Sequence, residues 1–372
     1  MSIKLITKTI IKSYLIPVLW IFLISLPIMG IVRSIIVAAC VLIGLLLFNI
    51  FIKGKGQVFN FGKHRFKPTL YFISRYAWLF ILVISFILPL FLNSYDVDVF
   101  TSVLFYTMLA LGLNLLVGEL GLLNLGYIAF YGIGAYTYAI LFSKFGIGFW
   151  ESLLIGGVVS AFFSLIIAIP TLRLKGDYLA IATLGFGEII RIVLNNWNSL
   201  TNGPNGIMNI PRPAIFGFSL ATGLRFFYLV LVFVVIEIYI LYRIKGSRFG
   251  RYAVAIRENE KASEMVGINT YKIKTLYFII SAFIGGVAGV LFAAKQMFVS
   301  PDSFTFIESV YVLAMVILGG MGNITGVVLG AFTLVILPEL LRGFVVYRML
   351  IFAILLISLM LYRPEGLLGK KA

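Results

Sequence analysis

The sequence predicts an all-α, polytopic transmembrane helical bundle of about 10–12 spans, with both termini in the cytoplasm. The 372 residues are 61% hydrophobic and only 12% charged, with a mean hydropathy of +1.08. A soluble domain has about 25% charged residues. The apolar residues form continuous runs about as long as the 20 residues that a helix needs to cross a bilayer. Because these runs do not alternate with polar residues, a membrane β-barrel is excluded.

Twelve apolar segments are predicted to be spans. They lie at about 14–32, 34–52, 76–93, 99–117, 127–143, 150–170, 178–196, 225–243, 275–294, 304–321, 324–341 and 346–362. Glycines in Gly118–Gly126 and Gly185–Arg191 could break the helices there and leave half-spans or re-entrant turns. The count therefore stays between about ten and twelve.

Basic loops orient these segments. Lys and Arg gather before the first segment, after the second, sixth and eighth, and at the end of the chain, whereas loops 93–98 and 195–213 are poor in both. Cytoplasmic loops of membrane proteins carry this excess of Lys and Arg. The rule places all five clusters in the cytoplasm and accounts for the net charge of +16. We therefore predict that a lipid bilayer surrounds the chain. We predict no binding of nucleic acid, since a nucleic-acid-binding surface would need a basic groove exposed to water.

The chain divides into two predicted parts. Residues 1–75 read as an N-terminal extension of two spans with a basic cytoplasmic linker, and residues 76–369 as the core. A polar segment, about 244–274, interrupts the core on the cytoplasmic side.

Catalytic and cofactor-binding motifs are missing from the sequence. Gly319–Asn323 is glycine-rich, but it lacks the Lys and Ser/Thr that a phosphate loop needs. Cys40 is the single cysteine, and His64 is the single histidine, so the chain holds no disulfide and no Cys/His metal cluster. We predict no enzymatic activity, no cofactor and no metal. The work of the chain must then be driven by a partner or by a gradient.

Two amides lie among the glycines of 112–126. Polar groups at membrane depth are costly and often line a pathway. Asn114 and Asn124 could therefore contact a substrate, or they could equally form hydrogen bonds between helices. If they line a pathway, Asn114→Leu and Asn124→Leu should impair uptake at normal expression.

Two further charged sites lie within apolar segments. Glu188 and Arg191 are three residues apart on a helix and can neutralise each other, so a local ion pair is favoured over a gate. Glu188 is retained as a candidate pathway residue. Glu237 is a lone acid that could pair with an arginine on another helix.

Glycines at four-residue spacing predict close helix packing. Gly322, Gly326 and Gly330 would share one face, and Gly285 and Gly289 another. Small residues let helices approach closely in lipid, which supplies no hydrophobic drive for association.

The polar segment contains a predicted helix with a glycine stop at residues 250–269. Its moderately apolar stripe has a spacing of three and four residues and consists of Tyr252, Ala255, Ile256, Asn259, Ala262, Ser263 and Val266. Mixed charges and small residues argue against a helix that rests on lipid. They favour a short helix that fits a groove on another protein.

Several motifs, in order, resemble the permease subunits of branched-chain amino-acid ABC importers. The matching stretches are 173–191, 202–207, 299–308, 318–322 and 363–368. The resemblance covers about 99–369 and is to the longer of the two paired permeases. It implies the ABC importer permease fold in a bacterial or archaeal cytoplasmic membrane.

The resemblance also implies partners. These are a homologous second permease subunit, two cytoplasmic ATP-binding subunits and an extracytoplasmic substrate-binding protein that delivers leucine, isoleucine or valine. Segment 250–269 resembles the region that couples to the ATPases, and the positions expected to couple are Gly250, Ala255, Arg257, Glu258, Glu260, Ala262 and Gly267. The segment lacks a strict Glu-Ala-Ala signature, so docking contacts of other importers do not carry over.

Three alternatives remain open from the sequence. The same kind of permease could carry urea, short amides or other amino acids, because the binding protein largely sets specificity. A gradient-driven carrier would transport alone in ATP-free liposomes. A membrane-embedded enzyme would need clustered acids or histidines at an interface, which the sequence does not offer.

Overall fold

The computed structural model describes residues 86 and 88–340, except 173, 175, 216, 217 and 221, together with 353, 357, 366 and 367. The structure does not describe the predicted extension 1–75, its spans at 14–32 and 34–52 or the boundary at 76. Of the predicted span at 346–362, it describes only residues 353 and 357. Contacts separate the chain into two compact units. We describe by itself the unit that contains Asn93–Glu339.

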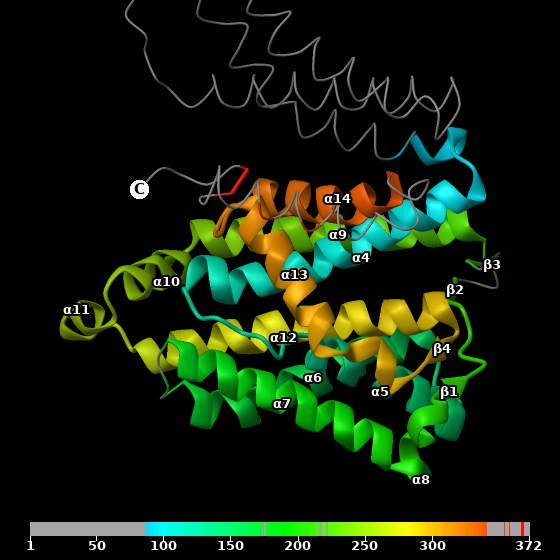
Figure 1. Cartoon of the computed structure of the whole chain (residues 1–372), viewed down its shortest axis with the longest axis horizontal. Coiled ribbons are helices and arrows are strands. Elements are labelled where there is room, and N and C mark those ends of the chain that lie inside the picture. Colours follow the sequence, from blue (N-terminus) through cyan, green and yellow to red (C-terminus); the bar gives the residue numbers. More distant parts are fainter. Residues whose placement is uncertain are drawn as a thin grey trace, which may run out of the picture. The chain divides into compact units, whose positions relative to one another are not determined.

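Long helices make up most of this unit (Figure 1). They are α4 (Ser94–Asn114), α5 (Ile128–Phe145), α6 (Phe149–Thr171), α7 (Asp177–Asn196), α9 (Gly223–Gly246), α12 (Thr270–Gln296), α13 (Phe306–Gly319) and α14 (Ile324–Leu340). A π-helical turn, η3 (Leu115–Glu119), continues α4. Two short helices, α10 (Arg248–Glu258) and α11 (Glu260–Met265), lie at one end of the long helices.

Short elements gather at the opposite end of the long helices (Figure 1). They are α8 (Asn198–Thr201), η4 (Gly203–Asn205), η5 (Pro301–Phe304) and the strands β1 (Ile207–Met208), β2 (Ala214–Ile215), β3 (Phe218–Ser219) and β4 (Phe298–Val299). Strand β1 pairs antiparallel with β4, and β2 pairs antiparallel with β3. A 3-10 turn, η2 (Leu88–Phe91), precedes α4 in the chain.

The described helices confirm a polytopic helical membrane protein. Within the described residues, five helical stretches are long and apolar enough to cross a bilayer. They are Ser94–Glu119, Phe149–Thr171, Gly223–Gly246, Thr270–Gln296 and Pro301–Gly319, and Ile324–Glu339 is a shorter apolar helix. The total span count and the side on which each terminus lies stay predictions.

The two glycine-rich stretches behave differently. The helix that begins with α4 ends in the π turn, and residues 120–127 form an irregular connection, as one of the predicted breaks allows. No break occurs within Gly185–Arg191, because α7 runs without interruption from Asp177 to Asn196. A glycine costs a helix only about 1 kcal/mol relative to alanine. At Gly187 it also permits contact, since a Cβ there would lie 3.1 Å from Cα of Gly126.

Glycines bring α5, α6 and α12 into backbone contact. A Cβ on Gly134 of α5 would collide with the carbonyl oxygen of Gly286 on α12. A Cβ on Gly286 would in turn collide with Ser160 of α6. The predicted packing role of Gly285 and Gly289 is also confirmed, since both face α5. These helices therefore form one closely packed group.

The predicted face of Gly322, Gly326 and Gly330 is wrong in one position. Gly322 precedes α14 and has a φ of +77°, so it belongs to the turn between α13 and α14 rather than to the helix. Gly326 and Gly330 do lie on α14 and pack against α13 at Gly319. The four-residue spacing continued past the helix start, and spacing alone does not reveal a left-handed residue.

Candidate coupling site

Segment 244–274 forms two short helices rather than the single predicted one. Asn259 is extended, with φ −157° and ψ 105°, and ends α10. Its side-chain oxygen then accepts a hydrogen bond of 3.0 Å from the backbone N–H of Ala262 and caps α11. Asparagine favours such caps over helix interiors because its side chain competes for backbone donors. The predicted glycine stop is confirmed at Gly267, which has a φ of +83°.

Arg257 of α10 contacts the end of the helix formed by α4 and η3. Its guanidinium donates a hydrogen bond of 2.6 Å to the carbonyl oxygen of Gly118. Its stem crosses Gly121, where a Cβ would lie 3.2 Å from Cγ of the arginine. A cation is favourable at a helix C-terminus, where carbonyl groups lack partners within the helix.

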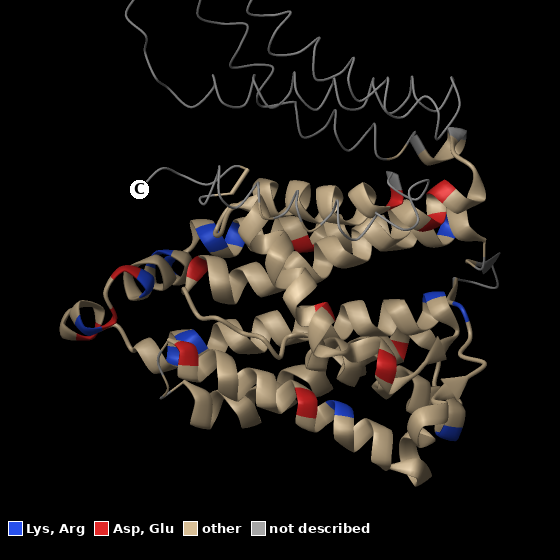
Figure 2. Cartoon of the chain, viewed as in Figure 1, with Lys and Arg blue, Asp and Glu red and all other residues tan. Residues whose placement is uncertain are grey.

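A second set of contacts joins the end of α9 to the same place. Lys245 lies 3.3 Å from Oε1 of the buried Glu119 and also donates to the carbonyl oxygen of Gly322. The N–H of Gly322 donates a hydrogen bond of 2.9 Å to the side-chain oxygen of Asn114. The turn between α13 and α14 is thereby held to α4 and to α9. Figure 2 shows the charged residues at this end of the helices.

Helix α11, the second short helix of the segment, is joined to α12. Lys274 is buried and forms an ion pair with Glu260 of α11. The hydroxyl of Thr270 donates a hydrogen bond of 2.8 Å to a carboxylate oxygen of Glu264. A buried cation is tolerated when it is paired, so these contacts fix α11 to the start of α12.

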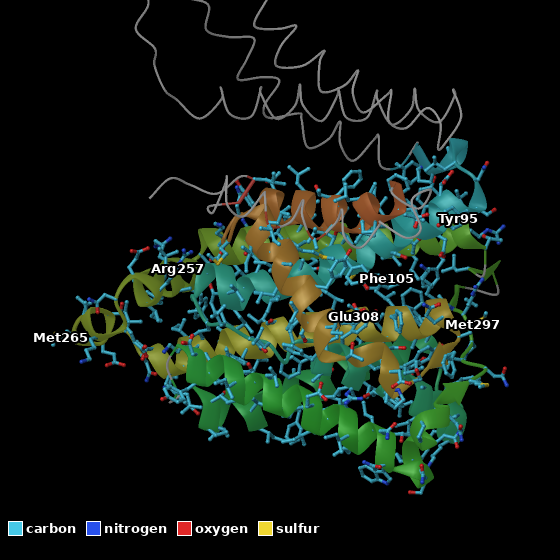
Figure 3. The ribbon with its side chains drawn as sticks, in the orientation of Figure 1. Tyr95, Phe105, Arg257, Met265, Met297 and Glu308 are labelled. Atoms are coloured by element: carbon cyan, nitrogen blue, oxygen red, sulfur yellow. The ribbon has the colours of Figure 1, made fainter. Side chains whose placement is uncertain are left out.

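Apolar side chains are exposed at the outer end of the segment. Met265 is 90% exposed and Val266 is 78% exposed. Figure 3 shows Met265 at the tip, beyond Arg257. An exposed apolar pair among charged residues is suited to contact with another protein.

The predicted coupling residues therefore fall into two groups. Gly250, Arg257 and Glu260 contact other parts of the same chain, while Ala255 is half-buried. Glu258, Ala262 and Gly267 are exposed. Sequence reasoning placed Val266 on the apolar stripe and missed Met265. The available signal was the pair of consecutive apolar residues directly before Gly267.

The amides proposed for a pathway are both buried. Asn114 holds the turn at Gly322, as described above, so the alternative of a contact between helices accounts for its side-chain oxygen. The side-chain oxygen of Asn124 accepts a hydrogen bond of 2.9 Å from the N–H of Gly126. Its side-chain nitrogen has no hydrogen-bond partner among the described residues. A role of either amide in a pathway stays a prediction.

The two remaining charged sites differ from each other. Glu188 and Arg191 form the expected local ion pair, 2.9 Å apart, on α7. Among the described residues, no arginine pairs with Glu237. Both carboxylate oxygens of Glu237 are buried there without a hydrogen-bond partner.

Loss of the pair on α7 should have a small effect. Its side chains are about one-third exposed, at 31% for Glu188 and 33% for Arg191, and such pairs contribute about 0.2–1 kcal/mol. We expect the double variant Glu188→Gln, Arg191→Gln to keep uptake within about threefold of the unchanged protein. Vesicle uptake assays at matched expression check this. A loss of more than about tenfold would instead support a role of Glu188 in the pathway.

Comparison with known proteins decides the family. The family described as "Branched-chain amino acid transport system / permease component" matches residues 96–360. The chain belongs to this family. The permease is 45% identical to the high-affinity branched-chain amino acid transport system permease proteins LivM of Salmonella typhimurium and Escherichia coli K12. Each alignment is 311 positions long and covers 77% of this chain and 73% of the relative.

A more distant relative belongs to a second kind of permease. The permease is 26% identical to the permease protein LivH of the same transport system of Escherichia coli K12, over 71% of this chain and 91% of LivH. No solved structure matches the permease. The relatives are transport permeases, and the chain is accordingly a transmembrane transport protein of the ABC permease class.

Proposed function

We propose that this permease carries leucine, isoleucine and valine across a bacterial or archaeal cytoplasmic membrane as a subunit of an ABC importer. Segment 244–274 receives the motion of partner ATPases. The observation that carries the proposal is the arrangement of this segment. Its inner residues contact α4, α9, α12 and the turn before α14, while its outer end exposes Met265 and Val266.

The contacts suggest how motion enters the membrane. Arg257 and Lys245 both reach the junction at Gly118, Glu119 and Gly322. Hydrogen bonds to charged groups are stronger and shorter than neutral ones. A displacement of α10 or α11 is therefore passed to the ends of several long helices together. Rocking of these helices would open the substrate path alternately to each side.

The partners in this proposal are a homologous second permease, two cytoplasmic ATP-binding subunits and an extracytoplasmic binding protein. The similarity to both LivM and LivH supports a pair of related permeases. With segment 244–274 in the cytoplasm, β1 to β4 and the short elements beside them face the binding protein. ATP hydrolysis is assigned to the partners.

The double variant Met265→Asp, Val266→Asp tests the docking surface. Two charges at the outer end should weaken docking of the ATPases, because burial of unpaired charge is costly. We expect at least about tenfold less ATPase subunit to co-purify, which corresponds to about 1.4 kcal/mol. Met208→Asp is the matched control, since Met208 is 64% exposed at the opposite end of the helices.

Two results would contradict the proposal. One is undiminished co-purification and ATP-driven leucine uptake by the double variant. The other is leucine uptake by the permease alone in ATP-free liposomes, which would indicate a gradient-driven carrier.

A further inference from the structure

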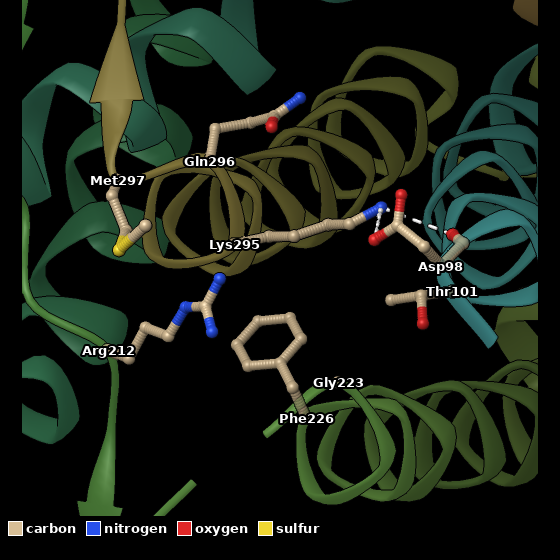
Figure 4. A pocket seen from close by; sticks show the side chains of 8 residues that line it. All are labelled: Asp98, Thr101, Arg212, Gly223, Phe226, Lys295, Gln296 and Met297. Carbon is tan, nitrogen blue, oxygen red and sulfur yellow. Dashed lines mark hydrogen bonds and ion pairs between the residues drawn. The ribbon is translucent and has the colours of Figure 1, made fainter. Parts of the chain in front are cut away.

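A cavity of about 240 Å³ lies at the end of the helices opposite to segment 244–274. Helices α4, α9 and α12 and the loop after β1 contribute its lining (Figure 4). Its charged residues are Asp98, Arg212 and Lys295. None of these three residues takes part in the coupling contacts described above.

Lys295 is a mostly buried cation at one wall of this cavity. Its side chain is 13% exposed, and its ammonium lies 3.1 Å from a carboxylate oxygen of Asp98. The ammonium also donates a hydrogen bond of 3.0 Å to Ser102 and lies 5.8 Å from the ring centroid of Phe105. These contacts fix the ammonium in one position.

The wall carries more positive than negative charge. Arg212 extends toward the same space as Lys295 (Figure 4), so two cations accompany the one carboxylate of Asp98. Asp98 itself is 67% exposed. An entering carboxylate therefore meets an excess of positive charge, and an entering ammonium meets an accessible acid.

The rest of the lining combines the apolar Phe226 and Met297 with Gly223 and the polar Thr101 and Gln296. Phe226 is only 4% exposed, while Met297 is 44% exposed at the rim. Met297 has a φ of +57°, in the left-handed region that side-chain-bearing residues rarely adopt. Its N–H donates to Ala293 and its carbonyl oxygen accepts from the N–H of Ile210, and these bonds hold it there.

We propose that this cavity binds a free α-amino acid with a small aliphatic side chain, which deepens the proposed function and rests on it. The α-carboxylate contacts Arg212 and Lys295, the α-ammonium contacts Asp98, and the side chain packs on Phe226 and Met297. A few charged and polar groups beside apolar side chains are typical of small-molecule sites. The cavity is smaller than the about 300–1,000 Å³ of drug-sized pockets, in keeping with a single small ligand.

The charges also predict weak binding. Lys295 is already paired with Asp98, and Asp98 is largely exposed to water. Contacts of exposed ions are weak, because water screens them. A ligand held this way is released readily, as a permease needs. The cavity would be the place where cargo enters after it leaves the binding protein.

Protection of a cysteine at the rim tests the site. The variant Met297→Cys is made with Cys40→Ser, which removes the single natural cysteine, and is assembled with its partner subunits in nanodiscs. The rate of modification by a charged thiosulfonate is measured with leucine, with leucinamide or with 4-methylpentanoate. We expect leucine to slow the modification at least about threefold, while the amide and the deaminated acid, which each lack one charge, do not.

Variants of residues that line the cavity distinguish a loss of leucine binding from a loss of folding. Lys295→Met with Arg212→Gln should abolish protection by leucine, whereas Lys295→Arg, which keeps the charge, should retain it. Met208→Cys, at the same end but outside the cavity, is the control that leucine should not protect.

Three outcomes would overturn the site. Leucine could fail to protect Met297→Cys although the same assembly transports leucine with ATP, in which case the proposed function stands and the cavity proposal fails. Equal protection by leucine and 4-methylpentanoate would show that Asp98 does not contact an α-ammonium, which overturns the proposed amino-acid site. Protection by unliganded binding protein but not by free leucine would identify a protein-docking surface. If the assembly without these substitutions shows no ATP-driven leucine uptake, that separate result counts against the proposed function.

Discussion

Replacing Arg257 by alanine is expected to uncouple ATP hydrolysis from transport while the subunits stay assembled. The guanidinium donates a hydrogen bond of 2.6 Å to Gly118 at the end of the helix that begins with α4. Hydrogen bonds to charged groups contribute about 1.5–3 kcal/mol. Without this contact, movement of α10 no longer reaches Gly118 directly. Leucine uptake in proteoliposomes should fall at least about tenfold, with a smaller decrease in ATP hydrolysis.

Arg251→Ala is the matched control. Arg251 is exposed on the same helix, and its bond of 3.4 Å to Gly246 stays within the neighbouring turn. Arg257→Lys should restore part of the uptake, because an ammonium can still donate to the carbonyl. Uptake by Arg257→Ala equal to that of the control would contradict the coupling role. Loss of the ATPase subunits from the purified assembly would show instead that Arg257 contacts them.

Replacing Gly134 by valine is expected to impair folding of the permease itself. A Cβ at this position would collide with the backbone of Gly286, so α5 and α12 would have to separate. Overpacking costs about 1–3 kcal/mol in well-packed cores, and backbone neighbours cannot move aside as side chains do. The yield of folded protein should fall, and its apparent melting temperature in detergent should drop by several degrees.

Gly185→Val separates packing from helix propensity. Gly185 lies within α7, and a Cβ there meets nothing within 4 Å. Valine should therefore be tolerated at this position and could even favour the helix over glycine. Equal melting temperatures of the two valine variants would show that the contact between α5 and α12 is not tight in the membrane.

The sequence was sufficient for the membrane class, for the long helices between residues 94 and 340 and for the presence of a polar segment at 244–274 between two of them. Apolar runs about 20 residues long have few alternatives in lipid, so they predict helices well. The break at Asn259 was not predictable, because asparagine also fitted the apolar stripe by spacing. Its capping bond to Ala262 decided between the two.

The sequence did not predict which residues far apart in the chain contact each other. Asn114 and Gly322 are 208 positions apart, and Lys295 and Ser102 are 193 apart. A single sequence shows that a charged or amide side chain is present, but it does not show which distant residue that side chain contacts. The sequence places Arg257 and Glu260 among the coupling positions, but it does not show that Arg257 contacts Gly118 or that Glu260 contacts Lys274.

The six-residue length of α11 has a consequence for local stability. Isolated helices shorter than about 12–15 residues are marginal in water. The order of α11 therefore depends on the Asn259 cap and on the bonds of Glu260 and Glu264 to the start of α12. Its local unfolding free energy is set by these few flanking contacts rather than by the core. The outer end can thus open locally while the long helices keep their packing.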